Sequence, residues 1–331
     1  MPVNTCRSPL DRVIKALDAA GVRTSDTLLM GFSGGRDSVA LATMLLEAGF
    51  SRLTLLHLDH GLRNESGEDA AWVVRFADSR GLAHRVQRAD VAAAAKAHKM
   101  GIEEAGRNAR YAFFADSAKT LNARKVLAAH HADDQVETFL FRLLRGSGAA
   151  GLCGMSASSP RLVDGVSFDL LRPMLEVWRA EIDAWITEKR LDFREDSSNQ
   201  DPRWTRNRIR HALIPALEEI MSKPVKTAIW RAAELIRADD AHLNELTSGL
   251  GHGDQTMDVA MLRSVSAAIQ RRLAIHWLRQ QGISNLGFDV VEAVVGLALQ
   301  DSPAKINLPG GAHARRRAGR IFIEAAEDSG S

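Results

Sequence analysis

The sequence of 331 residues has little cysteine, little net charge and no long hydrophobic run. Its two cysteines, Cys6 and Cys153, are far apart and form no CxxC pair, so a zinc finger, a thioredoxin-type site and an iron–sulfur cluster all lack ligands. No stretch reaches the roughly 18 apolar residues of a membrane span, and the first residues resemble an amphipathic helix rather than a signal peptide. We therefore expect a cytoplasmic protein without a membrane partner.

The charge balance is nearly neutral, with 43 lysines and arginines against 41 acidic residues and a formal net charge of +2. Hydrophobic residues make up 45% and charged residues 25% of the chain, which excludes collagen, a disordered tail and a disulfide scaffold. The net charge excludes only a uniformly basic protein. Between Arg203 and Arg237 there are eight lysines and arginines against three acidic residues, which leaves room for a local RNA contact surface.

Strand-like and helix-like segments alternate through the first half of the chain. The predicted strands are 27–32, 53–58, 83–87, 125–129 and 168–171, and the predicted helices are 39–48, 68–79, 102–122, 133–144 and 176–190. This order predicts an α/β fold with a doubly wound, mostly parallel sheet, which binds ligands outside the carboxyl ends of its strands.

The second half is dominated by helical patterns at 223–246, 267–281 and 289–300, with short strands expected at 304–308 and 320–324. We predict a catalytic domain over residues 1–212 and a smaller, mainly helical domain over residues 213–331. The sequence leaves the oligomeric state open, and a homodimer is one alternative.

The segment Ser33-Gly34-Gly35-Arg36-Asp37-Ser38 lies between the first predicted strand and helix. Its glycines allow a sharp turn with exposed N–H groups, and the following helix N-terminus favours an anion. The hydroxyl groups can donate to phosphate oxygens, and Asp37 can hold Mg²⁺. The segment is not a Walker A loop, because G-x4-G-K-[ST] is absent. A plain strand–turn–helix connection is the alternative.

Three further segments place polar groups near strand ends or on one helix face. The first is His57-Leu58-Asp59-His60-Gly61-Leu62-Arg63, which follows the second strand and is alternatively a polar loop. The second contains Glu103, Arg107 and Arg110 at i, i+4 and i+7, alternatively a surface ion-pair ladder. The third contains His130, Asp134 and Glu137, which share a face if the turn is helical from its start and could bind Mg²⁺ or an amine. An acid-rich helix start is its alternative interpretation.

A fifth segment is rich in arginine and contains a tryptophan. Arg203, Trp204, Arg206, Arg208 and Arg210 lie within eight residues, after Glu195-Asp196-Ser197-Ser198-Asn199. Guanidinium groups beside an aromatic ring suit phosphates and bases, although a solvated basic stretch is the alternative.

The S-G-G-x-D-S loop resembles that of the N-type ATP pyrophosphatases, and the later segments resemble one family among them. D-H-G-L-R, the E-x-x-x-R-x-x-R-Y helix with Gly106 in place of alanine, HHADDQVETFLFRLLRGSGAAGL and R-N-x-I-R are similar to the tRNA(Ile)-lysidine synthetases. The ordered match covers roughly residues 25–220. Longer family members carry a further C-terminal domain, for which we expect this chain to have no room.

The resemblance implies an ATP-dependent, AMP-forming ligase that acts on the first anticodon base, a cytidine, of the CAU-anticodon tRNA(Ile). The cytosine O2 would attack the α-phosphorus of ATP, and the ε-amine of free L-lysine would then attack C2 and expel AMP. A tRNA thiolase with the same ATP chemistry is one alternative, although the two distant cysteines disfavour it. A non-catalytic RNA-binding protein with a vestigial nucleotide site is the other.

The resemblance also implies a role for each motif residue. The implied catalytic residues are Asp37, His130, Asp134, Glu137 and Arg206, with Asp37 and Asp134 as Mg²⁺ ligands. The implied ATP-binding residues are Ser33, Gly34, Gly35, Arg36, Asp37, Ser38, His57, Asp59 and His60. The implied lysine-binding residues are Glu103, Arg107, Arg110 and Glu137, and the implied tRNA-binding residues are Arg203, Trp204, Arg208 and Arg210.

Overall fold

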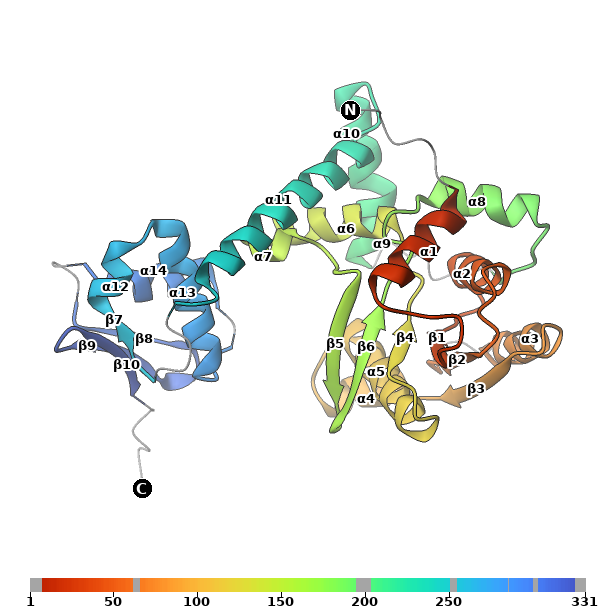
Figure 1. Ribbon diagram of the computed structural model, residues 1–331, viewed down its shortest axis with the longest axis horizontal. Coiled ribbons are helices and arrows are strands. Elements are labelled where there is room, and N and C mark those ends of the chain that lie inside the picture. The colour runs from red at the N-terminus through yellow and green to blue at the C-terminus, as the bar shows by residue number, and fades with distance from the viewer. Residues whose placement is uncertain are drawn as a thin grey trace. The chain divides into compact units, whose positions relative to one another are not determined.

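A computed structural model describes residues 8–61, 66–194, 204–250, 255–284, 286–299 and 303–324. The alternating segments of the first half build a six-stranded sheet with the order β3-β2-β1-β4-β6-β5 (Figure 1). Its strands are β1 (Leu28–Gly31), β2 (Leu53–Asp59), β3 (Ala83–Arg88), β4 (Lys125–Leu127), β5 (Ser158–Val163) and β6 (Val166–Leu171). Only β5 pairs antiparallel, with β6, which confirms the predicted doubly wound, mostly parallel sheet.

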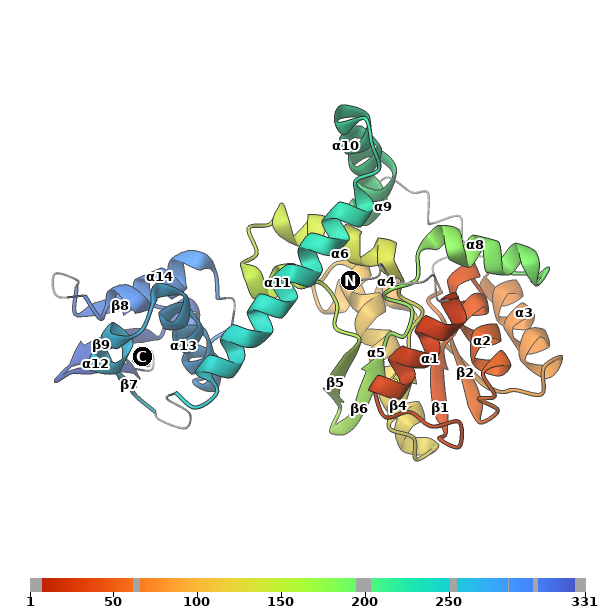
Figure 2. The ribbon, with the colours of Figure 1, turned by 45° about the horizontal axis from the view of Figure 1, so that its top comes forward.

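Helices cover both faces of this sheet because the side chains of a strand alternate between the faces (Figure 2). Leu28 and Met30 of β1 pack into one core, and Leu29 packs into the other. The first core is covered by α1 (Pro9–Ala19), α2 (Arg36–Glu47), α3 (Ser66–Asp78) and α8 (Arg179–Glu188). The opposite side holds α4 (Val91–Ala97) and α5 (Ile102–Thr120).

The strand order reverses between β1 and β4. The carboxyl end of β1 leads through Ser33–Ser38 into α2, and the carboxyl end of β4 leads into α6 (Ala132–Leu143). A crevice at such a reversal is the usual ligand site of doubly wound sheets. The fold therefore brings together two motifs that are about a hundred residues apart in sequence.

The helices that follow the sheet are α7 (Ala149–Leu152), α9 (Thr205–Arg208), the π-helical turn η2 (Ile209–Leu213), α10 (Ile214–Met221) and α11 (Lys226–Thr247). The chain divides into two compact units, one of Met1–Arg145 and Gly154–Arg231, the other of Gly146–Cys153 and Ala232–Ser331. This division falls within α11. Whether residues 1–212 and 213–331 form separate domains stays a prediction.

The second unit combines helices with an antiparallel sheet. Its further helices are α12 (Val259–Ser264), α13 (Ala267–Gln280), α14 (Phe288–Gly296) and the short 3-10 turn η3 (Pro309–Gly311). Its strands are β7 (Met257–Asp258), β8 (Lys305–Asn307), β9 (His313–Arg317) and β10 (Arg320–Glu324), in the order β7-β10-β9-β8. Leu262, Leu278 and Ile321 are fully buried in its core. The expected helices are present, and the sheet is larger than the two predicted strands.

No helix in the described part of the chain is both long enough and apolar enough to cross a membrane.

Candidate active site

The glycine-rich loop at the end of β1 has the backbone of an anion site. Gly34 has a φ of +81°, and Gly35 is the N-cap of α2 and provides no side chain to cap it. The Gly35 N–H donates to the Ser33 hydroxyl at 3.2 Å, and the Ser38 hydroxyl donates to the Gly35 carbonyl oxygen at 2.8 Å. The N–H groups of the first turn of α2 can therefore bind a negatively charged group, with the helix dipole in favour.

Neighbouring elements fix the shape of this loop. A Cβ atom on Gly34 would lie 3.3 Å from the Trp72 ring of α3, so no side chain fits there without movement. The Gly34 carbonyl oxygen accepts a hydrogen bond of 2.9 Å from the Arg194 N–H, and the Arg194 guanidinium pairs with Asp69 at 2.8 Å. The packing and this hydrogen bond both select the observed left-handed turn.

His57, Asp59 and His60 lie at the end of β2, beside the loop in the sheet order. His57 is buried, with Nδ1 3.0 Å from the carbonyl oxygen of Phe32. Asp59 is also buried and accepts a hydrogen bond of 2.8 Å from the Gly61 N–H. In this conformation the side chains of His57 and Asp59 hold backbone next to the loop. Direct contact of the three residues with ATP stays a prediction.

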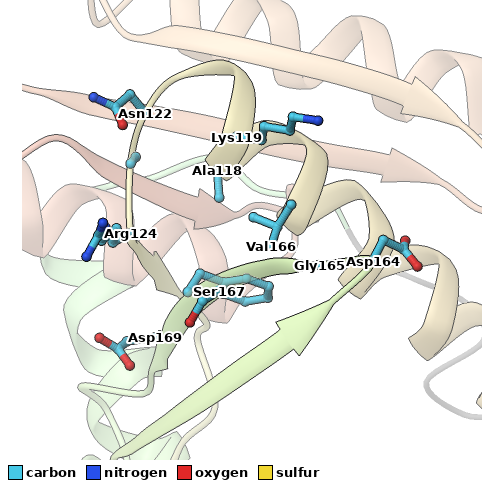
Figure 3. Close-up of a pocket in the computed structure, with 11 residues that line it drawn as sticks. Ala118, Lys119, Asn122, Arg124, Asp164, Gly165, Val166, Ser167 and Asp169 are labelled. Carbon is cyan, nitrogen blue, oxygen red and sulfur yellow. The ribbon is translucent and has the colours of Figure 1, made fainter.

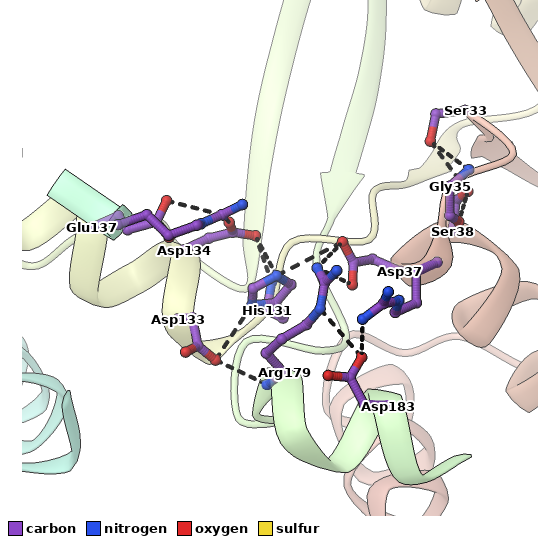
Figure 4. A network of polar contacts seen from close by, with 12 residues as sticks. Ser33, Gly35, Asp37, Ser38, His131, Asp133, Asp134, Glu137, Arg179 and Asp183 are labelled. Carbon is purple, nitrogen blue, oxygen red and sulfur yellow. Dashed lines mark hydrogen bonds and ion pairs between the residues drawn. The ribbon is translucent and has the colours of Figure 1, made fainter. Parts of the chain in front are cut away.

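An ion-paired centre joins the loop to the start of α6 (Figure 4). Both carboxylate oxygens of Asp37 lie 3.0 Å from Nη1 of Arg179, a residue of α8. Nε2 of the buried His131 is 3.8 Å from Asp37 and 3.6 Å from Asp134, so the imidazole lies between the two carboxylates. The structure thus brings together Asp37 and Asp134, the two predicted metal ligands.

Glu137 and Asp134 share a basic partner, Arg210 of the π-helical turn. The guanidinium contacts both Glu137 oxygens, from Nε at 2.5 Å and from Nη2 at 3.1 Å, and Nη2 also donates to Asp134 at 3.2 Å. Arg210 is predicted from the sequence as a tRNA contact, but in this conformation it binds the acidic residues of α6. The arginine-rich segment therefore forms part of the same site.

Other basic residues hold the remaining acids of the site. Asp133 accepts from the Arg179 backbone N–H and from Lys226 Nζ of α11, both at 2.8 Å. Asp183 lies 2.6 Å from Nη1 of Arg36 and 3.4 Å from Nε of Arg179. The sequence interpretation missed Arg179 and Lys226, because no local signal relates Arg179 to an aspartate 142 residues earlier.

Burial and neighbouring charges shift several pKa values in this centre. Burial raises the pKa of Asp37 despite the nearby His131 and Arg179, and burial raises the pKa of Glu137 despite Arg210. For Asp134 burial is outweighed, chiefly by the neighbouring histidines, and its pKa is lowered. Burial lowers the pKa of His130 to about 4, so this ring is neutral at physiological pH.

From the sequence, His130, Asp134 and Glu137 are predicted to share one helix face only if the turn is helical from its start, and α6 does not meet this condition. The helix begins at Ala132, and its N-cap His131 has an extended backbone whose N–H donates to Asp134 at 3.0 Å. His130 therefore precedes the helix and does not continue the face of Asp134 and Glu137. The reason is the hydrogen bond from the His131 N–H to the Asp134 carboxylate, which caps the N-terminus of the helix at His131.

Glu103, Arg107 and Arg110 all lie on α5, as expected, and are exposed. Glu103 pairs with Nε of Arg206 at 3.8 Å. A Cβ at Gly106 would meet its nearest neighbours at 3.7 Å, an ordinary contact, so the glycine is not required there by crowding. The side chains of α5 thus offer charged groups to solvent, and their ligand stays a prediction.

Of the predicted tRNA contacts, Trp204 is half-buried at the N-cap of α9, and Arg208 is exposed, with its guanidinium 3.2 Å from the Thr205 hydroxyl. Arg203 lies outside the described residues, as do Leu62, Arg63 and the segment 195–199.

The carboxylates of Asp37 and Asp134 fit a magnesium ion that is also bound by nucleotide phosphates. Within the described ranges, no group of three or more histidine, cysteine or acidic side chains could hold a metal by itself. Mg²⁺ usually takes one or two carboxylates and completes its shell with phosphates and water. Burial raises the pKa of Asp37, which shows a carboxylate poorly solvated in this site and one that a cation would stabilise.

A cavity of about 560 Å³ lies at the other end of the sheet, where β4 begins and the β5–β6 hairpin turns (Figure 3). Lys119, Arg124 and Asp169 are among its lining residues. It contains none of the residues predicted for the site.

Residues 6–217 match the family model of the PP-loop domain, and residues 257–322 match that of the TilS substrate binding domain. The tRNA(Ile)-lysidine synthase of Geobacter sulfurreducens is 37% identical over 322 residues, which cover 91% of this chain. The protein of the same name from Salinispora tropica is 35% identical over 95% of this chain and 96% of its own length. The chain belongs to the tRNA(Ile)-lysidine synthase family. It spans 67% of the Geobacter family member and 57% of the one from Thermus thermophilus.

Among solved structures, a U34-tRNA thiolase from Methanococcus maripaludis with its [4Fe-4S] cluster aligns with a TM-score of 0.55 and 17% identity, covering 69% of this chain and 78% of its own. At that identity the likeness concerns the fold alone. This chain and the thiolase share their fold over the aligned part.

Proposed function

We propose that the chain is a tRNA(Ile)-lysidine synthetase, which uses ATP to join the ε-amine of lysine to C2 of the first anticodon cytidine of CAU-anticodon tRNA(Ile). AMP and pyrophosphate are the other products. The observation that supports this proposal best is that His131 lies between Asp37 of the glycine-rich loop and Asp134 of α6, in a chain of this family. We expect the reaction to take place in the cytoplasm. A homodimer stays an expectation.

The first step needs a site for the pyrophosphate that leaves ATP. The backbone N–H groups of the first turn of α2 would supply donors for its oxygens, and the Gly35 N–H and the Ser33 and Ser38 hydroxyls would join them by exchanging their present contacts within the loop. The cytosine O2 forms a bond to the α-phosphorus as the bond to the pyrophosphate oxygen breaks. A bound Mg²⁺, held by Asp37 and Asp134, would neutralise charge on the phosphates.

The second step needs a deprotonated lysine ε-amine, whose ordinary pKa is about 10.4. Glu137 is a buried carboxylate whose raised pKa brings it closer to that of a useful base, and it can first bind the ammonium and then accept its proton. The neutral His130 ring is the alternative acceptor. Arg107 and Arg110 of α5 are proposed to bind the lysine carboxylate.

Arg206, Trp204 and Arg208 lie on or next to α9, in the same unit as the loop. We propose that Trp204 and Arg208 contact the anticodon loop, because stacking and phosphate contacts are the usual means of binding unpaired RNA. Arg206 would leave Glu103 and approach the reacting phosphate. Its pair with Glu103 is weak, because the two groups are 3.8 Å apart and partly exposed to solvent.

The test supplies ATP, Mg²⁺ and radiolabelled lysine with either the CAU isoleucine tRNA or the CAU methionine tRNA. Label is expected in the isoleucine tRNA only. Label in neither tRNA would contradict the proposal, and label in both would contradict the selectivity. Asp37→Ala should abolish both pyrophosphate release and lysine transfer, whereas Asp116→Ala, at an exposed acid of α5, should change neither.

The same assay separates the alternatives. A tRNA thiolase would release pyrophosphate with its tRNA but incorporate no lysine. A non-catalytic RNA-binding protein would release no pyrophosphate even with tRNA present.

A further inference from the structure

Arg210 makes a two-pronged ion pair with the most buried carboxylate of the site. The Glu137 side chain is 4% exposed, and its two oxygens are held by Nε and Nη2 of Arg210 at 2.5 and 3.1 Å. The Nη2 atom also donates to Asp134 at 3.2 Å. A planar guanidinium that meets both oxygens of a carboxylate is the strongest common form of charge-assisted hydrogen bonding in proteins.

The other acids of the site are held as well. Asp37 has Arg179 on both oxygens, and Asp133 has Lys226 on one oxygen and a backbone N–H on the other. An ammonium ion that arrives at this cluster must therefore replace a basic side chain, since a second cation beside an intact pair would repel the first. For an ammonium at Glu137, the cation to be replaced is Arg210.

The backbone under Arg210 allows such a replacement. Arg210 lies in the π-helical turn Ile209–Leu213, between two α-helical segments, and its side chain is 31% exposed. A π-turn carries one residue more than an α-turn, and such turns inside α-helices are frequent at functional sites. Its conversion to an α-turn would rotate the residues on one side by about 100° relative to the other, which is enough to move a side chain off its partner.

We propose that Arg210 occupies the ε-ammonium subsite in the lysine-free enzyme, so that lysine binds Glu137 only by displacing the Arg210 guanidinium. This inference rests on the proposed function, which places the lysine ammonium at Glu137. Arg210 thus acts as an internal competitor that weakens lysine binding and keeps the buried carboxylate neutralised until the substrate arrives. In this role it sets the affinity for lysine and does not touch the reacting atoms.

The test measures the Kd of radiolabelled lysine by equilibrium dialysis with the full chain, without tRNA, at pH 8. Arg210→Met should lower the Kd by at least about tenfold, because a charge-assisted pair of this kind changes an equilibrium constant by roughly that factor or more. Arg52→Met is the matched control. Arg52 donates to the Ser25 carbonyl oxygen at the amino end of β2, and its loss should leave the Kd unchanged.

Chemical rescue separates competition from a structural role. Ethylguanidinium should fill the space left in Arg210→Met and raise its Kd for lysine back toward the wild-type value, with little effect on the wild type. A folded Arg210→Met that binds lysine no tighter than the wild type, or that does not respond to ethylguanidinium, overturns the inference. If Arg210→Met does not fold, Arg210→Lys decides, since its single ammonium cannot form the fork. Tighter lysine binding supports the inference, and equal or weaker binding overturns it.

The two proposals fail in different ways. If the wild-type chain transfers lysine to tRNA but Arg210→Met binds lysine no more tightly than the wild type, the proposed function stands and the inference fails. A wild-type chain that transfers no lysine loses the proposed function first.

Discussion

Replacement of Gly34 by alanine is expected to damage the phosphate loop by two separable effects. The φ of +81° costs a residue with a Cβ atom roughly 1–2 kcal/mol. The new methyl group would also lie 3.3 Å from two atoms of the Trp72 ring and 3.4 Å from Val73, and crowding of this kind costs about 1–3 kcal/mol. We expect the two costs together to lower the free energy of unfolding by about 2–5 kcal/mol.

Gly21→Ala isolates the first effect. Gly21 has a φ of +63°, and a Cβ there would meet no atom within 4 Å, so only the backbone cost of about 1–2 kcal/mol applies. Urea unfolding followed by tryptophan fluorescence gives both free energies, and calorimetric titration gives the ATP affinity. Gly34→Ala should weaken ATP binding, because the strained loop no longer presents its N–H groups, and Gly21→Ala should not. The reasoning is refuted if Gly34→Ala is no more destabilising than Gly21→Ala, or if it binds ATP like the wild type.

Three further changes are expected to have measurable effects. Arg179→Met removes a guanidinium that lowers the pKa of Asp37, a pKa that burial raises, so the pKa should rise further. The acid limb of the pH profile of pyrophosphate release should therefore move to higher pH, and an unchanged acid limb would contradict this. Asp240→Asn breaks an ion pair with Arg272 in which each side chain is 12% exposed. The free energy of unfolding of the second unit, measured in urea, should fall by about 3 kcal/mol, and a fall of less than about 1 kcal/mol would contradict this. His130 has a pKa of about 4 when folded and about 6.5 when unfolded, so the unfolded chain binds more protons between these values and stability falls as pH drops through them. His130→Asn should therefore lose less melting temperature between pH 7 and pH 4.5 than the wild type; an equal loss would speak against the lowered pKa.

The parallel sheet could be predicted from the sequence because its signals are local. β2 and α5 begin at the residues expected, 53 and 102, since apolar runs and helical spacing depend only on near neighbours. β9 was missed because, of His313–Arg317, only Ala314 is buried, so the strand has no apolar alternation. β5 was missed for a related reason, since it is an edge strand that contains Pro160.

The site could be predicted only in part. The loop and the α6 acids were found because each is a contiguous motif with a characteristic composition. The meeting of Asp37 and Asp134 at His131 follows from the strand order, which a motif alone does not contain. Arg179 was missed because its role is a side-chain contact across 142 residues of sequence. Such a residue has no local signal, and only the packing of α8 on the sheet reveals it.

The basic stretch 203–237 shows the limit of what local composition predicts about RNA binding. Its eight cations suggest an RNA contact surface, but four of them form ion pairs with acidic residues: Arg206 with Glu103, Arg210 with Glu137, Lys226 with Asp133 and Arg237 with Glu234. Arg208, Lys223 and Arg231 are the cations without an acidic partner in the part of the stretch that the structure describes. Phosphate binding by the paired cations would have to exchange one anion for another, and two of the acids released, Glu103 and Glu137, are those proposed for lysine. The affinity of this stretch for RNA is therefore coupled to the occupancy of the active site, and local charge alone overstates it.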